Sequence, residues 1–159
     1  SGINDGANIG DDINYSGTVA AAREGFLHGV NSIAISIANK KNPKYKDCSI
    51  YFKTILDKII SIKLKSFFLN INYPNVVNDK IKGIKITRQG KSKFRDAFHK
   101  NESNDTYRLD GELKVIRDED SNDDHCVDDG WVSLTPLQFN LTHLEHYSIL
   151  KNIESSFTI

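Results

Sequence analysis

The clearest periodic pattern in the chain lies between residues 48 and 62. Apolar residues recur there with spacings of 4, 3, 4 and 3, the repeat of one face of an α-helix. The stripe consists of Cys48, Phe52, Ile55, Ile59 and Ile62, widened by Leu56 and Ile60. Short β-branched or aromatic runs at residues 32–37 and 67–73 flank this helix and are typical of strands. A strand, a helix and a strand of these lengths predict an α/β fold with a parallel sheet and the helix on one of its faces.

The first fifteen residues show neither a helical nor a strand period. Glycines alternate there with Asn and Asp, which are turn formers, so we predict a loop. Ser16-Gly17-Thr18 then precedes an alanine-rich run, and Ser or Thr is a good helix N-cap. The pattern predicts a helix over about residues 17–27, ended near Gly29.

The second half of the chain is less regular. Residues 83–87 predict a weaker strand, and residues 88–120 are charged with little periodicity, which indicates a hairpin arm that projects from the sheet. Residues 131–137 alternate and indicate a short strand that ends at a proline. Residues 142–145 match a capping box, which predicts a C-terminal helix to about Glu154.

An acid-rich segment occupies residues 118–129. We interpret it as a solvated surface helix with its flanks. Calcium binding is the alternative interpretation, although no EF-hand spacing is present.

Composition narrows the class of protein. A chain of 159 residues predicts one domain, residues 1–159. Lys plus Arg and Asp plus Glu both number 21, so binding to a nucleic-acid duplex by bulk charge is not expected. No apolar run reaches the length of a membrane span, so we expect no membrane partner. Two cysteines form neither a disulfide framework nor a zinc site, which favours reduced thiols and a cytoplasmic location.

The glycine-rich loop and the helix after it are the strongest candidate for chemistry. A helix N-terminus offers free N–H groups with positive partial charge, and Ser16, Gly17 and Thr18 lie where a phosphate would be held. The segment is neither a Walker A loop nor a dinucleotide fingerprint. Phosphate binding and a plain capped turn therefore both remain open.

Other candidates are weaker. The five histidines share no metal-ligand spacing, and His143 and His146 are expected on an exposed helix face. Three Asp-Asp pairs occur, but none ends a predicted strand, where a sheet enzyme presents its metal ligands. These pairs are Asp11-Asp12, Asp123-Asp124 and Asp128-Asp129.

Several short segments form an ordered set along the chain. The N-terminal ones are Ser1-Gly2-Ile3-Asn4, the Gly6–Asp12 loop and residues 15–25. The later ones are residues 32–36, 69–74, 86–90 and 130–137, and together the segments cover essentially the whole chain. In this order they resemble the SurE survival-protein family of metal-dependent nucleotidases.

The resemblance implies roles for individual residues. Asn4 matches an asparagine that helps hold one divalent metal ion, with Mg or Mn expected. Asn8, Ser16, Gly17 and Thr18 match phosphate-binding positions. The family has a Rossmann-like parallel sheet with a projecting β-hairpin arm and a C-terminal helix, and it hydrolyses nucleoside monophosphates. A homodimer or higher oligomer formed through the arm and the C-terminal helix is therefore expected.

The sequence departs from the family in one respect. Family members open with a strand that ends in an Asp-Asp pair and have a serine in a later loop, which are further metal ligands. Nothing here matches them, and Asp11-Asp12 lies at a position that the family already fills. We therefore expect the N-terminal strands to be missing, no catalytic residue to be identifiable, and the strand at residues 32–37 to have an open edge. A noncatalytic phosphate- or nucleotide-binding remnant and a degraded, functionless product are the alternatives to an enzyme.

Overall fold

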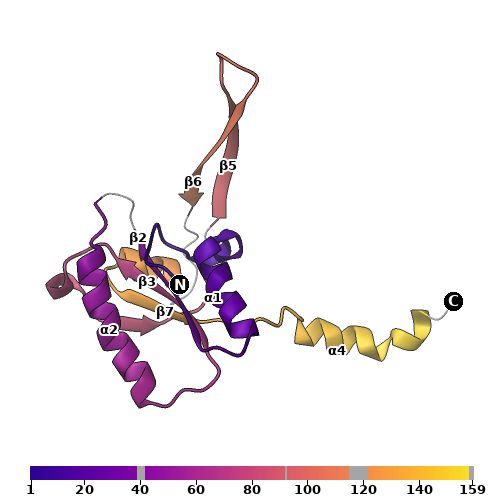
Figure 1. Ribbon diagram of the computed structural model, residues 1–159. Helices are drawn as coiled ribbons and strands as arrows, with labels where there is room; N and C mark the ends of the chain where they lie inside the picture. The colour runs from indigo at the N-terminus through magenta and orange to yellow at the C-terminus, as the bar shows by residue number, and fades with distance from the viewer. Residues whose placement is uncertain (39–41, 92, 115–121, 158–159) are drawn as a thin grey trace.

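The computed structural model describes residues 1–38, 42–91, 93–114 and 122–157 (Figure 1). The strands are β1 (Asn4–Asp5), β2 (Ser32–Ala38), β3 (Phe68–Pro74), β4 (Ile84–Ile86), β5 (Lys93–Lys100), β6 (Tyr107–Lys114) and β7 (Val132–Pro136). The α-helices are α1 (Gly17–Leu27), α2 (Tyr45–Ser61), α3 (Asp123–Asp128) and α4 (Leu144–Asn152). The short 3-10 helices are η1 (Gly10–Tyr15), η2 (Asn78–Lys80) and η3 (Glu154–Phe157).

A five-stranded sheet in the order β1-β2-β3-β7-β4 forms the centre of the fold. Strands β2 and β3 are parallel, as the strand-helix-strand pattern predicted, and β1 runs parallel to β2. Strand β7 runs antiparallel to β3, and β4 runs parallel to β7. The sheet is therefore mixed rather than wholly parallel. The chain reverses direction between β3 and β4, which are joined by residues 75–83 without a crossover α-helix.

Helices α1 and α2 cover opposite faces of β2 and β3 (Figure 1). On the α2 face, Ile55 and Ile59 belong to one buried cluster with Ile71. On the α1 face, Val19 belongs to a second cluster with Phe68. Because successive side chains of a strand point to opposite faces, β3 presents Asn70 and Asn72 on the same face as Phe68.

The predicted stripe of α2 is buried only in part. Cys48, Ile55 and Ile59 are buried, but Ile60 is 64% exposed and Ile62 is 69% exposed. Helix α2 ends at Ser61, so Ile62 lies beyond its last residue. Both cysteines are free and buried.

The N-terminal residues correct two expectations. Residues 1–6 run alongside β2 rather than forming an unpaired loop: Ile35 N–H donates to Ser1 O at 2.9 Å and Gly6 N–H donates to Ile37 O at 2.9 Å. Strand β2 is thus paired on both sides, by β1 and by β3, and its edge is not open. The remainder of the predicted loop contains η1.

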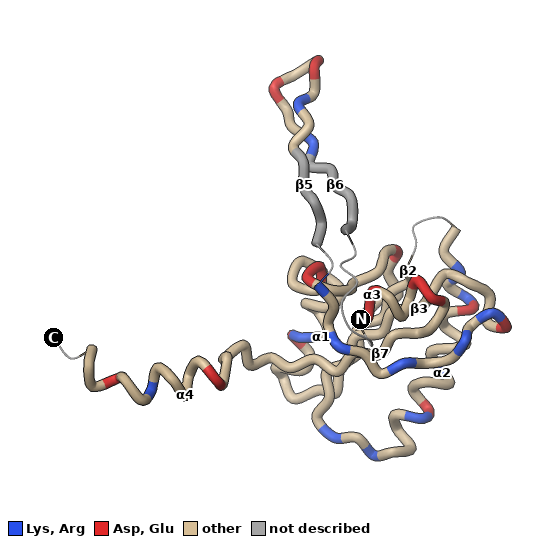
Figure 2. Tube along the Cα trace, turned by 180° about the vertical axis from the view of Figure 1, so that it is seen from behind, with Lys and Arg blue, Asp and Glu red and all other residues tan. Residues whose placement is uncertain are grey.

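The hairpin arm and the C-terminal helix both extend from the body of the molecule (Figures 1 and 2). Strands β5 and β6 form the predicted arm as an antiparallel pair. Residues 92 and 115–121 of the predicted arm lie outside the described residues. The predicted capping box is wrong, because the N-cap of α4 is His143, whose Nδ1 accepts from the His146 N–H at 3.2 Å. Within the described residues, no helix is both long and apolar enough to cross a membrane.

Candidate phosphate-binding site

The start of α1 is built as the sequence predicts. Ser16 is the N-cap, and its Oγ accepts from the Val19 N–H at 3.1 Å. The Ser16 hydroxyl hydrogen is therefore available to a further acceptor. Gly17 and Thr18 occupy the first turn, where backbone N–H groups have no intrahelical acceptor. These donors and the positive end of the helix dipole suit a phosphate group.

Asn4 and Asn8 meet in a second group of polar side chains, next to β2. The Asn4 side-chain oxygen accepts from Ser36 Oγ at 2.7 Å and from Asn8 Nδ2 at 3.2 Å. Asn8 Nδ2 also donates to Ser36 Oγ, and the Asn4 amide nitrogen donates to Gly6 O at 3.0 Å. Three polar side chains thus close a ring of hydrogen bonds beside the carboxyl end of β2.

Two asparagines of β3 hold the backbone of Asn8. Asn72 Oδ1 accepts from the Asn8 N–H at 2.8 Å, and Asn72 Nδ2 donates to Asn8 O at 3.0 Å. Asn70 Nδ2 donates to the same oxygen at 2.8 Å. Both β3 asparagines are fully buried. Sequence reasoning did not assign them to the site, although two polar residues inside an apolar strand were a visible signal.

The five predicted site residues therefore fall into two groups. Ser16, Gly17 and Thr18 share the start of α1, whereas Asn4 and Asn8 share the ring beside β2. Asn8 uses its side-chain amide hydrogens on Asn4 and Ser36, so its observed contacts hold the loop in place.

The described residues alone do not fit a divalent metal ion. Such an ion takes several oxygen ligands, and carboxylates are usual among them. The Asn4 amide oxygen already accepts two hydrogen bonds. Among the residues that the structure describes, no group of three or more His, Cys, Asp or Glu side chains comes together.

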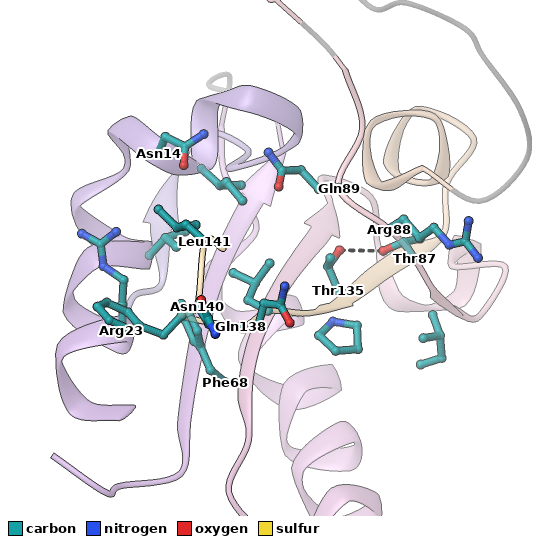
Figure 3. Close-up of a pocket in the computed structure, with 16 residues that line it drawn as sticks. Asn14, Arg23, Phe68, Thr87, Arg88, Gln89, Thr135, Gln138, Asn140 and Leu141 are labelled. Atoms are coloured by element: carbon teal, nitrogen blue, oxygen red, sulfur yellow. Dashed lines mark hydrogen bonds between the residues drawn. The ribbon is translucent and has the colours of Figure 1, made fainter. Parts of the chain in front are cut away.

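A pocket of about 900 Å³ lies on the α1 face of the sheet (Figure 3). Asn14 and Arg23 lie on its α1 side, and Thr87, Arg88 and Gln89 lie on the opposite side. Thr87 Oγ1 and Thr135 Oγ1 are 2.7 Å apart in its wall. None of the five predicted site residues lines this pocket.

The acid-rich segment is not the solvated helix that the sequence predicted. Asp123 and Asp124 are fully buried at the start of α3; residues 118–121 lie outside the described residues. Asp123 Oδ1 accepts from the Gly90 N–H at 2.8 Å, and both Asp123 carboxylate oxygens lie 3.2 Å from the Gly10 N. The carboxylate thus joins two backbone segments far apart in sequence, which local composition could not reveal.

Position 90 has room only for a glycine. A Cβ there would lie 2.6 Å from Asp124 Oδ2, so a larger residue would displace the buried carboxylate of Asp124, next to Asp123. Gln89 contributes as well, because its Nε2 donates to Gly10 O at 3.1 Å. Both backbone polar groups of Gly10 are therefore held, the N–H by Asp123 and the C=O by Gln89.

The buried Asp123 carboxyl predicts a pH dependence of stability. Burial raises its pKa from 3.8 to about 6, and the N–H donors of Gly90 and Gly10 oppose this shift only in part. The folded state then binds more protons than the unfolded state between these values. The stabilising contribution is therefore fully present below about pH 4 and is lost as the pH rises through about 6, a change on the order of 3 kcal/mol.

Urea unfolding at a series of pH values checks this expectation. Asp123→Asn should remove the contribution of Asp123 to the slope of the unfolding free energy against pH, because the Asn side chain does not titrate. The control is Asp128→Asn, which changes an exposed carboxylate of the same helix and should keep the wild-type slope. Equal slopes for wild type and Asp123→Asn would contradict the expectation.

Fold and site together define an α/β protein of Rossmann-like architecture whose helix α1 begins with N–H groups that have no intrahelical acceptor. The family model described as "Survival protein SurE" matches residues 1–96. The chain belongs to the SurE family. It is 40% identical over 155 residues to the "5'-nucleotidase SurE" of Kosmotoga olearia, covering 95% of this chain and 61% of that protein. It is 34% identical over 157 residues to the protein of the same name from Alkaliphilus metalliredigens, covering 96% and 62%.

A solved structure agrees with the sequence comparison. The crystal structure of the SurE protein from Aquifex aeolicus superposes with a TM-score of 0.82 at 36% identity, covering 97% of this chain and 64% of that one. The chain thus spans less than two thirds of the length of these relatives.

Proposed function

We propose that this chain forms the phosphate-binding part of a metal-dependent nucleotidase that hydrolyses nucleoside monophosphates to nucleoside and phosphate. The proposed enzyme class is a 5'-nucleotidase-type phosphomonoesterase. The Ser16-capped start of α1, with donors from three consecutive residues, is the observation that carries the proposal. The names of the SurE relatives support the substrate class.

In this proposal the chain's residues bind and orient the phosphate. The Gly17 and Thr18 N–H groups and the Ser16 and Thr18 hydroxyls donate to its oxygens. Such fixed donors stabilise negative charge without reorganising during the reaction. Asn8 would reach the phosphate only by giving up one of its hydrogen bonds to Asn4 or Ser36.

One divalent ion, Mg or Mn, is the proposed cofactor. Its proposed ligand in this chain is the Asn4 side-chain oxygen, which would exchange one of its two accepted hydrogen bonds for the metal. The further ligands would come from outside the described residues.

The alternative is a noncatalytic phosphate- or nucleotide-binding remnant. Such a remnant would bind phosphate at the same start of α1 but would not hydrolyse the nucleotide. The partly buried ring of Asn4, Asn8 and Ser36 is compatible with both possibilities. An assay of phosphate release separates them, whereas a binding measurement does not.

The experiment that tests the proposal uses Thr18→Ala and Asn4→Ala in a fusion of this chain to the part of a SurE relative that it does not span. Thr18→Ala should lose a charge-assisted hydrogen bond to phosphate, about 1–3 kcal/mol in kcat/KM. Asn4→Ala should weaken metal affinity and turnover together. Steady-state phosphate release from AMP at varied Mn²⁺ measures both effects.

Ser49→Ala is the matched control, because Ser49 is an exposed hydroxyl residue on α2 that bonds only locally, to Lys46 O at 2.8 Å. It should leave kcat/KM unchanged. If Thr18→Ala changed neither KM nor kcat, the phosphate role of this residue would be wrong.

We also propose a homodimer or higher oligomer, formed through the arm and α4. Both carry exposed apolar side chains: Phe98 is 73% exposed on the arm, and Leu144 is 70% exposed on α4. Sedimentation equilibrium should give a mass of at least two chains, and Leu144→Lys with Leu150→Lys should lower it. A monomer at micromolar concentration would contradict this.

No duplex or membrane partner is proposed, and the proposed location is cytoplasmic.

A further inference from the structure

Gly10 is the point at which the glycine-rich loop becomes η1. It has a φ of +53°, a left-handed conformation that favours glycine. Just before it, the Asn8 backbone is fixed by Asn70 and Asn72. From it, η1 runs to Tyr15 and leads directly into the Ser16 N-cap. The position of Gly10 therefore determines where the start of α1 lies relative to the ring of Asn4, Asn8 and Ser36.

Two side chains from the distant part of the chain hold this residue. Asp123 accepts its N–H and Gln89 donates to its C=O. The Asp123 carboxylate accepts from the backbone N–H groups of Gly10, Gly90 and Asp124. Within the described part of the chain these donors are all neutral. Burying a carboxylate against neutral donors is a costly way to stabilise a fold, since burial disfavours its charge. Its arrangement is better suited to fixing several N–H groups at one point.

We propose that Asp123, together with Gln89, positions the phosphate-binding start of α1 by clamping Gly10. This rests on the proposed function of Ser16, Gly17 and Thr18. Asp123 is a positioning residue, because it acts through the backbone of Gly10 and contacts none of the phosphate-binding residues. We call the contacts of Asp123 and Gln89 with Gly10 the clamp. The clamp also reaches the base of the arm, since Gly90 precedes β5 and β5 lies against η1.

The clamp predicts separate effects on the loop and on anion binding. Asp123→Ala removes the acceptor for Gly10 and Gly90, and Gln89→Ala removes the exposed donor to Gly10 O. Asp123→Asn keeps one oxygen in the place of Oδ1, which makes the shorter bond to Gly90. We therefore expect Asp123→Ala to have the largest effect, and Asp123→Asn to restore most of the wild-type behaviour.

The experiment uses the 159-residue chain with sulfate as the probe, because sulfate is a dianion at neutral pH and resembles a phosphate monoester. Amide hydrogen exchange of residues 10–18 reports on the loop, and an NMR titration gives the sulfate affinity. Asp123→Ala should speed exchange and weaken sulfate binding, each by about tenfold, and Gln89→Ala should weaken binding by about threefold. Asp128→Asn, an exposed residue of α3, should change neither.

The outcomes are distinguishable. A purely structural role would lower the unfolding midpoint of Asp123→Ala while leaving the sulfate affinity of the folded chain unchanged, and this would overturn the proposal. If Asp123→Ala fails to fold, Gln89→Ala decides: unchanged exchange at residues 10–18 together with an unchanged sulfate affinity in this variant would overturn the proposal. If the wild-type chain binds no sulfate, the phosphate assignment itself fails. Exchange at residues 10–16 then still shows whether the clamp exists.

Discussion

The 159-residue chain on its own should release no phosphate from AMP or GMP, with either Mg²⁺ or Mn²⁺ added. The physical reason is the ligand set. Within the described residues Asn4 supplies one neutral oxygen, and no three acidic, His or Cys side chains converge on one point. A divalent ion held by one neutral ligand cannot be fixed in a catalytic geometry. A colorimetric phosphate assay against a vector-only preparation measures this.

The fusion to the part of a SurE relative that this chain does not span is the positive control. It should release phosphate in the presence of metal, and Asn4→Ala should reduce that release. Turnover by the unfused chain above the vector-only preparation would contradict the expectation. It would show that residues outside the described ranges complete a metal site, or that the reaction does not need one.

Replacing Asn72 by Leu should destabilise the fold by about 3–4 kcal/mol, because two hydrogen bonds to a buried backbone are lost together. Asn72 is fully buried and pairs with both the N–H and the C=O of Asn8. The Asn8 C=O retains its bond from Asn70, but the Asn8 N–H loses the Oδ1 acceptor of Asn72. Urea unfolding of the purified chain measures the free-energy difference.

Asn152→Leu is the matched control, since Asn152 is exposed at the end of α4. It makes the same chemical change and should alter stability by less than about 0.5 kcal/mol. A similar loss in both variants would point to a general effect of the substitution. A loss below about 1 kcal/mol in Asn72→Leu would mean that Asn8 finds water or another partner.

Local signals predicted the helices and strands that depend on local chemistry. Helix α1 has the predicted bounds, because Ser16 caps it and the alanines after it are strong helix formers. The apolar spacing placed α2, and the β-branched run placed β2, to within three residues. The order of SurE-like segments correctly predicted the family.

What the sequence could not show was contact between distant segments. Asp123 is adjacent to other acidic residues in sequence, so it was expected in water. Its partner Gly10 is 113 positions away, and only the folded chain brings the two together. The same holds for residues 1–6, whose pairing with β2 depends on backbone groups that composition does not reveal. The antiparallel direction of β7 relative to β3 was also hidden, because the chain reverses between β3 and β4, far from β7 in sequence.

The pairing of β1 with β2 has a consequence for how the ring beside β2 could fail. Asn4 lies opposite Ser36 and Asp5 lies opposite Ile37. Slippage of this short strand by one residue would turn every side chain to the other face of the sheet. The carboxylate of Asp5 would then replace the neutral amide of Asn4 beside Ser36, and a like charge would repel an incoming phosphate. The backbone bonds from Ile35 to Ser1 and from Gly6 to Ile37 bracket β1 and fix its alignment.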